Sequence, residues 1–231
     1  MPYFFASERN GDQVAILGED ARHLAGPLRA RAGELIQVVE ADGHLLGVRL
    51  LSVSSREVVG RVEWTRDHAP EPRSRLLLAV AMLPATGLEH VLSRATELGA
   101  AGFILVQADR SVARGDKAAR WATICREAAM LAGRLAVPDV RGPVSLREAF
   151  ASGPALLLNR DAPRRLAEIA AGAPAGEDHA FTLAIGPEGG WSPAEIELAG
   201  EAVASLGPRN LRADTAALAA TAVWLAGRGD L

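Results

Sequence analysis

The stretch FTLAIGPEGGWSPAEIELAGEAVASLGPRNLRADTAALAATAVWL, residues 181–225, decides the fold of this chain. Its first five residues are apolar and end at a glycine, which predicts a short buried strand. A Gly-Pro-Glu-Gly-Gly turn follows. Ser192, Pro193 and Glu195 then form a capping box with proline at the first helical position, which predicts a helix start. In open α/β sheets a glycine turn between a strand's carboxyl end and a helix's amino end is a place where ligands bind.

A second loop, residues 206–212, lies downstream and leads into an alanine-rich segment. Asp214 is the predicted N-cap of a final helix over Asp214–Ala226. The glycine turn matches neither a dinucleotide-binding fingerprint nor a phosphate-binding P-loop. Taken alone, it is as consistent with a structural turn as with a ligand site.

Both loops together resemble one family. IGPEGGWSPAEIE at 185–197 and LGPRNLRADTAALAA at 206–220 are similar to the carboxyl-terminal signature of the ribosomal RNA small subunit methyltransferase E family. That family methylates uridine N3 in 16S rRNA and belongs to the SPOUT superfamily of knotted methyltransferases. The resemblance extends to SRATELGAAGFILVQADRSV at 93–112 and ICREAAMLAGRLAVPDV at 124–140, and so covers most of the chain.

The composition is that of an ordinary folded protein. The 231 residues are 49% hydrophobic and 23% charged, which leaves room for one large or two smaller domains. No apolar run approaches the length of a membrane span, and the first residues do not read as a signal peptide. A single cysteine, Cys125, excludes an internal disulfide framework and predicts a cytoplasmic protein. With five scattered histidines, we expect no metal site.

The charge pattern gives a weak indication of RNA binding. The net charge is −3, but residues 110–134 contain six basic side chains and two acidic ones. Arginine suits phosphate recognition because its guanidinium presents a fork of donors. Heavy arginine use is equally consistent with a biased genome composition, so both explanations stay open.

The amino-terminal 70 residues predict a small β-rich domain. Apolar segments at 14–17, 35–39, 45–53 and 58–62 predict strands, Asp42-Gly43 predicts a hairpin, and a helix is expected at 20–31, disturbed by Pro27. Phe4-Phe5 and the segment RHLAGPLRARAGELI at 22–36 resemble the family's PUA-like RNA-binding β-barrel. The polar, proline-rich segment 67–75 is the predicted linker.

Beyond the linker, strands alternate with helices. We expect strands at 76–83, 103–106, 155–158 and 181–185, and helices at 88–98, 116–131, 163–170, 193–204 and 214–226, with a flexible loop at 171–176. This alternation predicts an α/β fold with a mostly parallel sheet. The resemblance implies a PUA-like barrel over residues 1–70, then a SPOUT-type α/β domain over 75–231 with a carboxyl-terminal trefoil knot.

The resemblance implies S-adenosyl-L-methionine as cofactor and a site built from the loops. The expected cofactor-binding residues are Leu158, Asn159, Ile185, Gly186, Pro187, Gly189, Gly190, Leu206, Gly207, Arg209 and Leu211. The expected catalytic residues are Arg212, which would stabilise a uracil anion, and Asp214 and Glu188. Asp214 as a helix cap and Glu188 as a turn residue are the alternatives.

The resemblance also implies partners. The substrate would be 16S rRNA or the small ribosomal subunit, contacted through Arg22, Arg29, Arg31, Arg110 and Arg134. The chain is expected to form a homodimer, to which the apolar residues Leu218, Val223, Trp224 and Leu225 of the final helix would contribute. No membrane and no metal are expected.

Two other functions remain open. A SPOUT methyltransferase could act on another RNA atom, such as a ribose 2′-hydroxyl. An RNA-binding or ribosome-assembly protein could have lost catalysis. The second alternative rests on departures from the family pattern: Met130-Leu131 stands where Glu-Gln is usual, and residues 84–87 lack the usual basic side chain.

Overall fold

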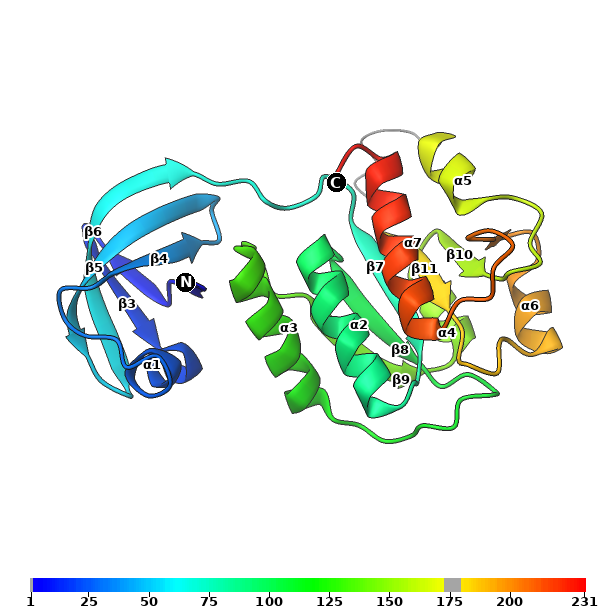
Figure 1. Ribbon diagram of the computed structural model, residues 1–231, viewed down its shortest axis with the longest axis horizontal. Coiled ribbons are helices and arrows are strands. Elements are labelled where there is room, and N and C mark those ends of the chain that lie inside the picture. Colours follow the sequence, from blue (N-terminus) through cyan, green and yellow to red (C-terminus); the bar gives the residue numbers. More distant parts are fainter. Residues whose placement is uncertain (1, 173–179) are drawn as a thin grey trace. The chain divides into compact units, whose positions relative to one another are not determined.

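The computed structural model describes residues 2–172 and 180–231, and its elements are drawn in Figure 1. The chain divides into two compact units. The first contains the residues up to Glu71 together with Ala129–Val137, and the second contains Pro72–Ala128 and Pro138–Leu231. Residues 173–176 of the expected loop lie outside the described residues.

The first unit contains a six-stranded sheet in the order β1-β4-β5-β6-β3-β2. Every pairing is antiparallel except that of β1 with β4. The Asp42-Gly43 hairpin is confirmed, since Gly43 has φ +96 in the turn between β4 and β5. The strands are β1 (Tyr3–Phe5), β2 (Glu8–Asn10), β3 (Gln13–Leu17), β4 (Leu35–Glu40), β5 (His44–Val53) and β6 (Glu57–Asp67).

Helix α1 (Gly18–Ala25) is shorter than expected at its carboxyl end. The Gly26 N–H donates to the Arg22 carbonyl, and Pro27 follows. Proline has no N–H and its ring clashes with the preceding turn, so the helix predicted to reach residue 31 ends before Pro27. Arg22, Arg29 and Arg31 are all exposed on this helix and the loop after it.

The core of this unit contains a residue from a distant part of the sequence. Met130 is only 4% exposed and packs among Phe4, Leu24, Val38 and other buried residues of the sheet and α1. The departure from the family pattern at Met130 therefore lies in a core rather than at an RNA or dimer surface, whereas its neighbour Leu131 is 61% exposed.

Arg134 also has a structural position. Its side chain is 6% exposed and its guanidinium donates to Glu71 through both Nε and Nη2, the latter at 2.5 Å. Glu71 also accepts the Leu135 N–H at 2.9 Å. The expectation that Arg134 contacts RNA is therefore replaced: its charge is neutralised inside the protein, because a buried guanidinium needs a paired carboxylate.

We expect Glu71→Ala to lower the free energy of unfolding by about 3 kcal/mol, because it leaves the buried Arg134 guanidinium without its carboxylate. Glu63→Ala is the matched control, since it removes a bidentate pair with Arg49 that is about 40% exposed and should cost far less, because solvent screens the two charges. Urea unfolding of both variants measures the difference. Equal losses would show that the burial of the Arg134 pair contributes nothing.

The second unit contains a six-stranded sheet in the order β12-β10-β11-β7-β8-β9, and all of its pairings are parallel. This confirms the expected α/β class. The strands are β7 (Leu76–Ala81), β8 (Gly102–Val106), β9 (Asp139–Val144), β10 (Ala155–Leu158), β11 (Phe181–Ile185) and β12 (Val203–Ala204).

Helices cover both faces of this sheet. Ala79, Ala81, Ile104 and Val106 pack with residues of α4 (Leu146–Phe150) and α6 (Pro193–Ala199) on one face. Figure 1 shows α2 and α7 in front of the strands, on the other face, where they contact each other. The other helices and their bounds are α2 (Ala85–Leu98), α3 (Ala118–Ala132), α5 (Leu166–Gly172) and α7 (Ala213–Gly227).

Several predicted bounds are wrong in informative ways. The helix expected at 193–204 ends at Ala199, because Gly200 takes φ +56 and the chain then forms the edge strand β12. The sequence pattern did not predict β1, β2, β9, β12 or α4, of which β12 has two residues and α4 has five. Helix α2 begins three residues earlier than expected, at Ala85.

None of the helices within residues 2–172 and 180–231 combines the length and the apolar character that a membrane-spanning helix requires.

Candidate functional site

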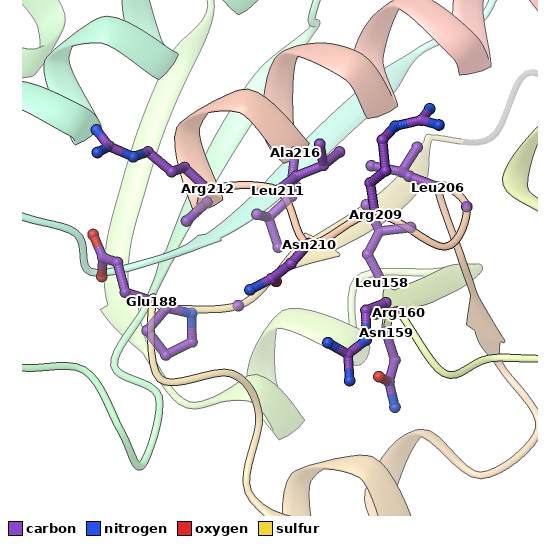
Figure 2. A pocket seen from close by; sticks show the side chains of 15 residues that line it. Leu158, Asn159, Arg160, Glu188, Leu206, Arg209, Asn210, Leu211, Arg212 and Ala216 are labelled. Atoms are coloured by element: carbon purple, nitrogen blue, oxygen red, sulfur yellow. The ribbon is translucent and has the colours of Figure 1, made fainter.

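A cleft of about 310 Å³ lies at the carboxyl ends of β10 and β11 in the second unit (Figure 2). Three loops and the start of α7 form its walls. The lining residues are Leu158, Asn159, Arg160, Ile185, Gly186, Pro187, Glu188, Leu206, Gly207, Arg209, Asn210, Leu211, Arg212, Ala213 and Ala216. The structure thus brings together most of the residues that the sequence predicts for a cofactor site.

Strand pairing places these loops beside one another. Leu157 of β10 lies opposite Ala184 of β11, and Leu158 lies opposite Ala204 of β12. The Asn159 N–H continues this ladder by donating to the Ala204 carbonyl at 2.9 Å. Because parallel strands end at a common edge, the loops that follow all three strands meet there.

Gly189 and Gly190 do not line the cleft, although the sequence analysis placed them in the cofactor site. Gly190 has φ +69 and donates its N–H to the Pro187 carbonyl at 2.8 Å, so it closes the turn. A Cβ on Gly189 would face the Arg110 side chain at 3.4 Å. Both glycines therefore shape the turn that contains Gly186–Glu188. They do not line the cleft themselves, and they affect it only by setting the shape of that turn.

Trp191 connects two walls of the cleft. The ring is 6% exposed, and its indole N–H donates to the Leu158 carbonyl at 3.1 Å. A Cβ on Gly186 would lie 3.1 Å from the same ring, so glycine is needed for this close approach. The sequence analysis missed Trp191, although an aromatic residue directly after a glycine turn was the available signal.

The loop after β8 braces the glycine turn. The Arg110 guanidinium donates to the carbonyls of Gly189 at 3.0 Å and Trp191 at 3.2 Å. These contacts use only Nη1 of an exposed side chain, so the expectation that Arg110 binds RNA stays a prediction.

The predicted capping box at Ser192 and Glu195 is confirmed, and it extends to the same loop. The Ser192 hydroxyl donates to an Asp109 carboxylate oxygen at 2.5 Å. The Asp109 N–H donates to Glu195 at 3.0 Å. The start of α6 is thus anchored to β8 by polar contacts that no local sequence pattern reveals.

The prediction that Asp214 caps α7 is wrong. Arg212 is the N-cap residue, with extended backbone angles and no side-chain cap, and Asp214 is the second residue of the helix. The Asp214 carboxylate accepts the Thr215 N–H at 2.7 Å. A carboxylate in the first turn is favoured by the helix dipole, so Asp214 suits this position without serving as the cap.

Charged side chains lie at both ends of the cleft. Figure 2 shows Arg160 and Arg209 near Leu158 and Leu206. It shows Glu188 and Arg212 at the opposite end, which we call the charged end because charges of both signs lie there. A second cavity, of about 600 Å³, shares Glu188, Arg212 and Ala213 with the cleft. Its lining residues are Leu83, Pro84, Thr86, Gly87, His90, Glu188, Arg212, Ala213 and Asp214. Arg160, Asn210, Ala213, Ala216 and His90 are lining residues that the sequence analysis did not select.

The final helix exposes less apolar surface than its sequence indicates. Trp224 and Leu225 are buried, and the Trp224 ring stacks on Phe181 with centroids 4.0 Å apart. Only Leu218 and Val223 of the four selected residues are partly exposed. Of the four apolar residues expected to contribute to a dimer interface, only these two therefore remain accessible to a partner.

Among the described residues, one group could offer metal ligands: Glu40, Asp42 and His44 at the β4–β5 hairpin. Glu40 forms an ion pair with Arg9 at 2.5 Å, and Asp42 lies 2.9 Å from His44. These two pairs explain why the three side chains lie close together, and we assign no metal to them.

Comparison with known proteins identifies relatives over the whole length. Residues 69–225 match the model of an RNA methyltransferase domain. The ribosomal RNA small subunit methyltransferase E of Bacillus subtilis is 32% identical over 229 residues, which cover 88% of this chain and 86% of that protein. Its namesake in Mycobacterium tuberculosis is 33% identical over 227 residues, with 91% and 85% covered.

A solved structure agrees with the sequence relatives. The ribosomal RNA small subunit methyltransferase E of Neisseria gonorrhoeae, bound to S-adenosyl methionine, superposes with a TM-score of 0.83 at 28% identity and covers 96% of this chain and 95% of its own. The chain therefore belongs to the ribosomal RNA small subunit methyltransferase E family.

Proposed function

We propose that this protein transfers the methyl group of S-adenosyl-L-methionine to N3 of a uridine in 16S rRNA. The observation that carries the proposal is the cleft at the ends of β10 and β11, which has apolar walls and a charged end. A family member with a closely similar fold binds S-adenosyl methionine. Mass-spectrometric mapping of ribosomal RNA from a deletion strain, with and without the restored gene, tests the proposal directly.

The cleft fits the adenosyl part of this cofactor. Leu158, Ile185, Leu206 and Leu211 offer apolar walls for an adenosyl group, and the exposed backbone of the loops offers hydrogen bonds to the adenine edge. Glu188 and Arg212 lie at the other end of the cleft, where the acceptor would approach. When bound, the cofactor supplies an electrophilic sulfonium methyl group.

The charged residues would act on the acceptor. Uridine N3 carries a weakly acidic proton, so attack at N3 requires a proton acceptor and stabilisation of the uracil anion. Arg212 provides the stabilising charge, Asp214 accepts the proton, and Glu188 orients Arg212. Arg212 and Glu188 line both cavities, and Asp214 lines the second.

The rest of the family resemblance completes the proposal. The first unit is a PUA-like barrel that binds the RNA through Arg22, Arg29 and Arg31, which are all exposed. The carboxyl-terminal half carries the trefoil knot, and the protein works in the cytoplasm on the small ribosomal subunit. An RNA-binding protein without catalysis is less favoured, because Met130 lies in a core and the cleft keeps both charged residues.

We expect Gly190→Val to weaken S-adenosyl-L-methionine binding about tenfold, because a β-branched residue at φ +69 strains the turn that presents Gly186 to Glu188. Gly189→Ala is the matched control: its φ is ordinary and its Cβ would make only a normal contact with Arg110. Calorimetry measures both affinities. If Gly190→Val bound as tightly as Gly189→Ala, the shape of the turn would not matter to the cofactor.

We expect Arg212→Ala to lower the single-turnover rate about 100-fold or more, the scale for losing one charge-stabilising donor. Cofactor affinity should change little, since the backbone makes most of those contacts. Arg212→Lys should restore only part of the rate, because an ammonium cannot replace the planar guanidinium. A normal Arg212→Ala rate at saturating cofactor and RNA would remove Arg212 from the mechanism.

We propose that the protein is a homodimer and expect sedimentation at micromolar concentration to give twice the chain mass of 24.2 kDa. Leu218→Arg should shift the equilibrium toward monomer, because it places a charge on the partly exposed face of α7. Sedimentation of the unmodified protein as a monomer would contradict the proposal.

A further inference from the structure

The second cavity lies where an acceptor for methyl transfer must lie. In-line transfer requires the attacking atom to approach the methyl group without occupying the cofactor's own space. The acceptor therefore needs a separate cavity that opens on the cofactor cleft. The cavity formed by the loop after β7, by α2 and by the start of α7 meets this condition, since it shares Glu188, Arg212 and Ala213 with the cleft.

A further described cavity also touches the cleft, but in a less suitable place. It has about 320 Å³, lies against α5 and the later part of α7, and shares only Leu206 with the cleft. Leu206 lies away from Glu188 and Arg212 in Figure 2. An acceptor there would meet Arg165 but would be remote from Glu188, Arg212 and Asp214, to which the proposed function assigns the reaction.

The walls of the second cavity carry donors and acceptors of the kinds that the N3 edge of uracil requires. That edge presents a carbonyl, an N–H and a second carbonyl, and so requires donors on either side of an acceptor. Arg212 supplies donors, and Asp214 and Glu188 supply acceptors. Cytosine has no proton on N3, so a carboxylate placed opposite that atom would repel it.

The wall that α2 contributes to the cavity includes an aromatic ring, that of His90, on which a base could stack. His90 is exposed on the second turn of α2, on the same side as Thr86 and Gly87. Gly87 leaves the space open, since a Cβ there would meet nothing nearer than Leu83 at 3.9 Å. Bases displaced from RNA commonly stack on aromatic side chains, histidine included.

We propose that this cavity receives the target base, and that the His90 ring stacks on it and positions its N3 edge toward Arg212 and Asp214. This inference rests on the proposed function and adds an acceptor site on α2. His90 is a substrate-binding residue in this assignment, and the proton goes to Asp214.

The first test compares His90→Ala with His90→Phe in single-turnover methylation of small ribosomal subunits purified from a deletion strain. Stacking predicts that His90→Ala lowers kcat/KM roughly tenfold, mainly through KM, and that His90→Phe stays close to the unmodified protein, because any aromatic ring can stack. If both variants lose the same activity and the acidic limb of the pH–rate profile changes, the ring acts through its nitrogens and the stacking assignment is overturned.

The second test fills the cavity. Thr86→Trp should lower the methylation rate by about 100-fold or more, because the base no longer reaches the reacting position. Its affinity for S-adenosyl-L-methionine, measured by calorimetry, should be unchanged. Ala85→Trp is the matched control: Ala85 is exposed at the start of the same helix and does not line the cavity. Equal losses in the two variants, or full activity of Thr86→Trp, would overturn the assignment.

Failure of the two proposals can be told apart. If the unmodified protein methylates another atom or binds no cofactor, the proposed function fails, whatever the variants do. If the unmodified protein methylates uridine N3 while the His90 and Thr86 variants behave like it, only the acceptor site fails.

Discussion

The site depends on one hydrogen bond between two strand ends. The Trp191 indole N–H holds the Leu158 carbonyl, while the same ring packs against Gly186. Parallel pairing brings β10 and β11 to a common edge, but loops beyond a strand end have no ladder to fix them. Trp191 supplies that constraint, because a buried ring with a satisfied donor can occupy only one orientation. The spacing between the Leu158 wall and the glycine turn is therefore set by the size of an indole.

A second constraint reaches the turn from β8. Arg110 binds two carbonyls of the turn, and Asp109 binds both members of the capping box that starts α6. These contacts satisfy backbone groups that a sharp turn would otherwise leave without partners. They also link the loop after β8 directly to the glycine turn that lines the cleft.

The sequence predicts what is local. The capping box at Ser192, the strand at 181–185 and the hairpin at Asp42-Gly43 depend on neighbouring residues, and all three are confirmed. Sequence-based prediction is wrong where the position of a residue depends on a partner far away along the chain. Arg134 is buried because Glu71 lies beside it, and Gly189 faces Arg110 rather than the cleft. Edge strands such as β12 are too short to carry a pattern. His90 was missed because its cavity is completed by α7, more than a hundred residues away along the chain.

The start of α7 explains why anionic chemistry belongs at the charged end of the cleft. Arg212 is the N-cap, with φ −63 and ψ 153, so its backbone is extended while the next residue is already helical. This change of direction leaves the guanidinium at the mouth of both cavities, beside the amino end of a fifteen-residue helix. The helix dipole and the guanidinium both favour negative charge at the same place. In the proposed reaction a neutral uracil would gain little from either, whereas the anion formed as N3 loses its proton would gain from both. The arrangement would then be complementary to the reacting state of the base, which is the property that lowers a barrier rather than merely tightening binding.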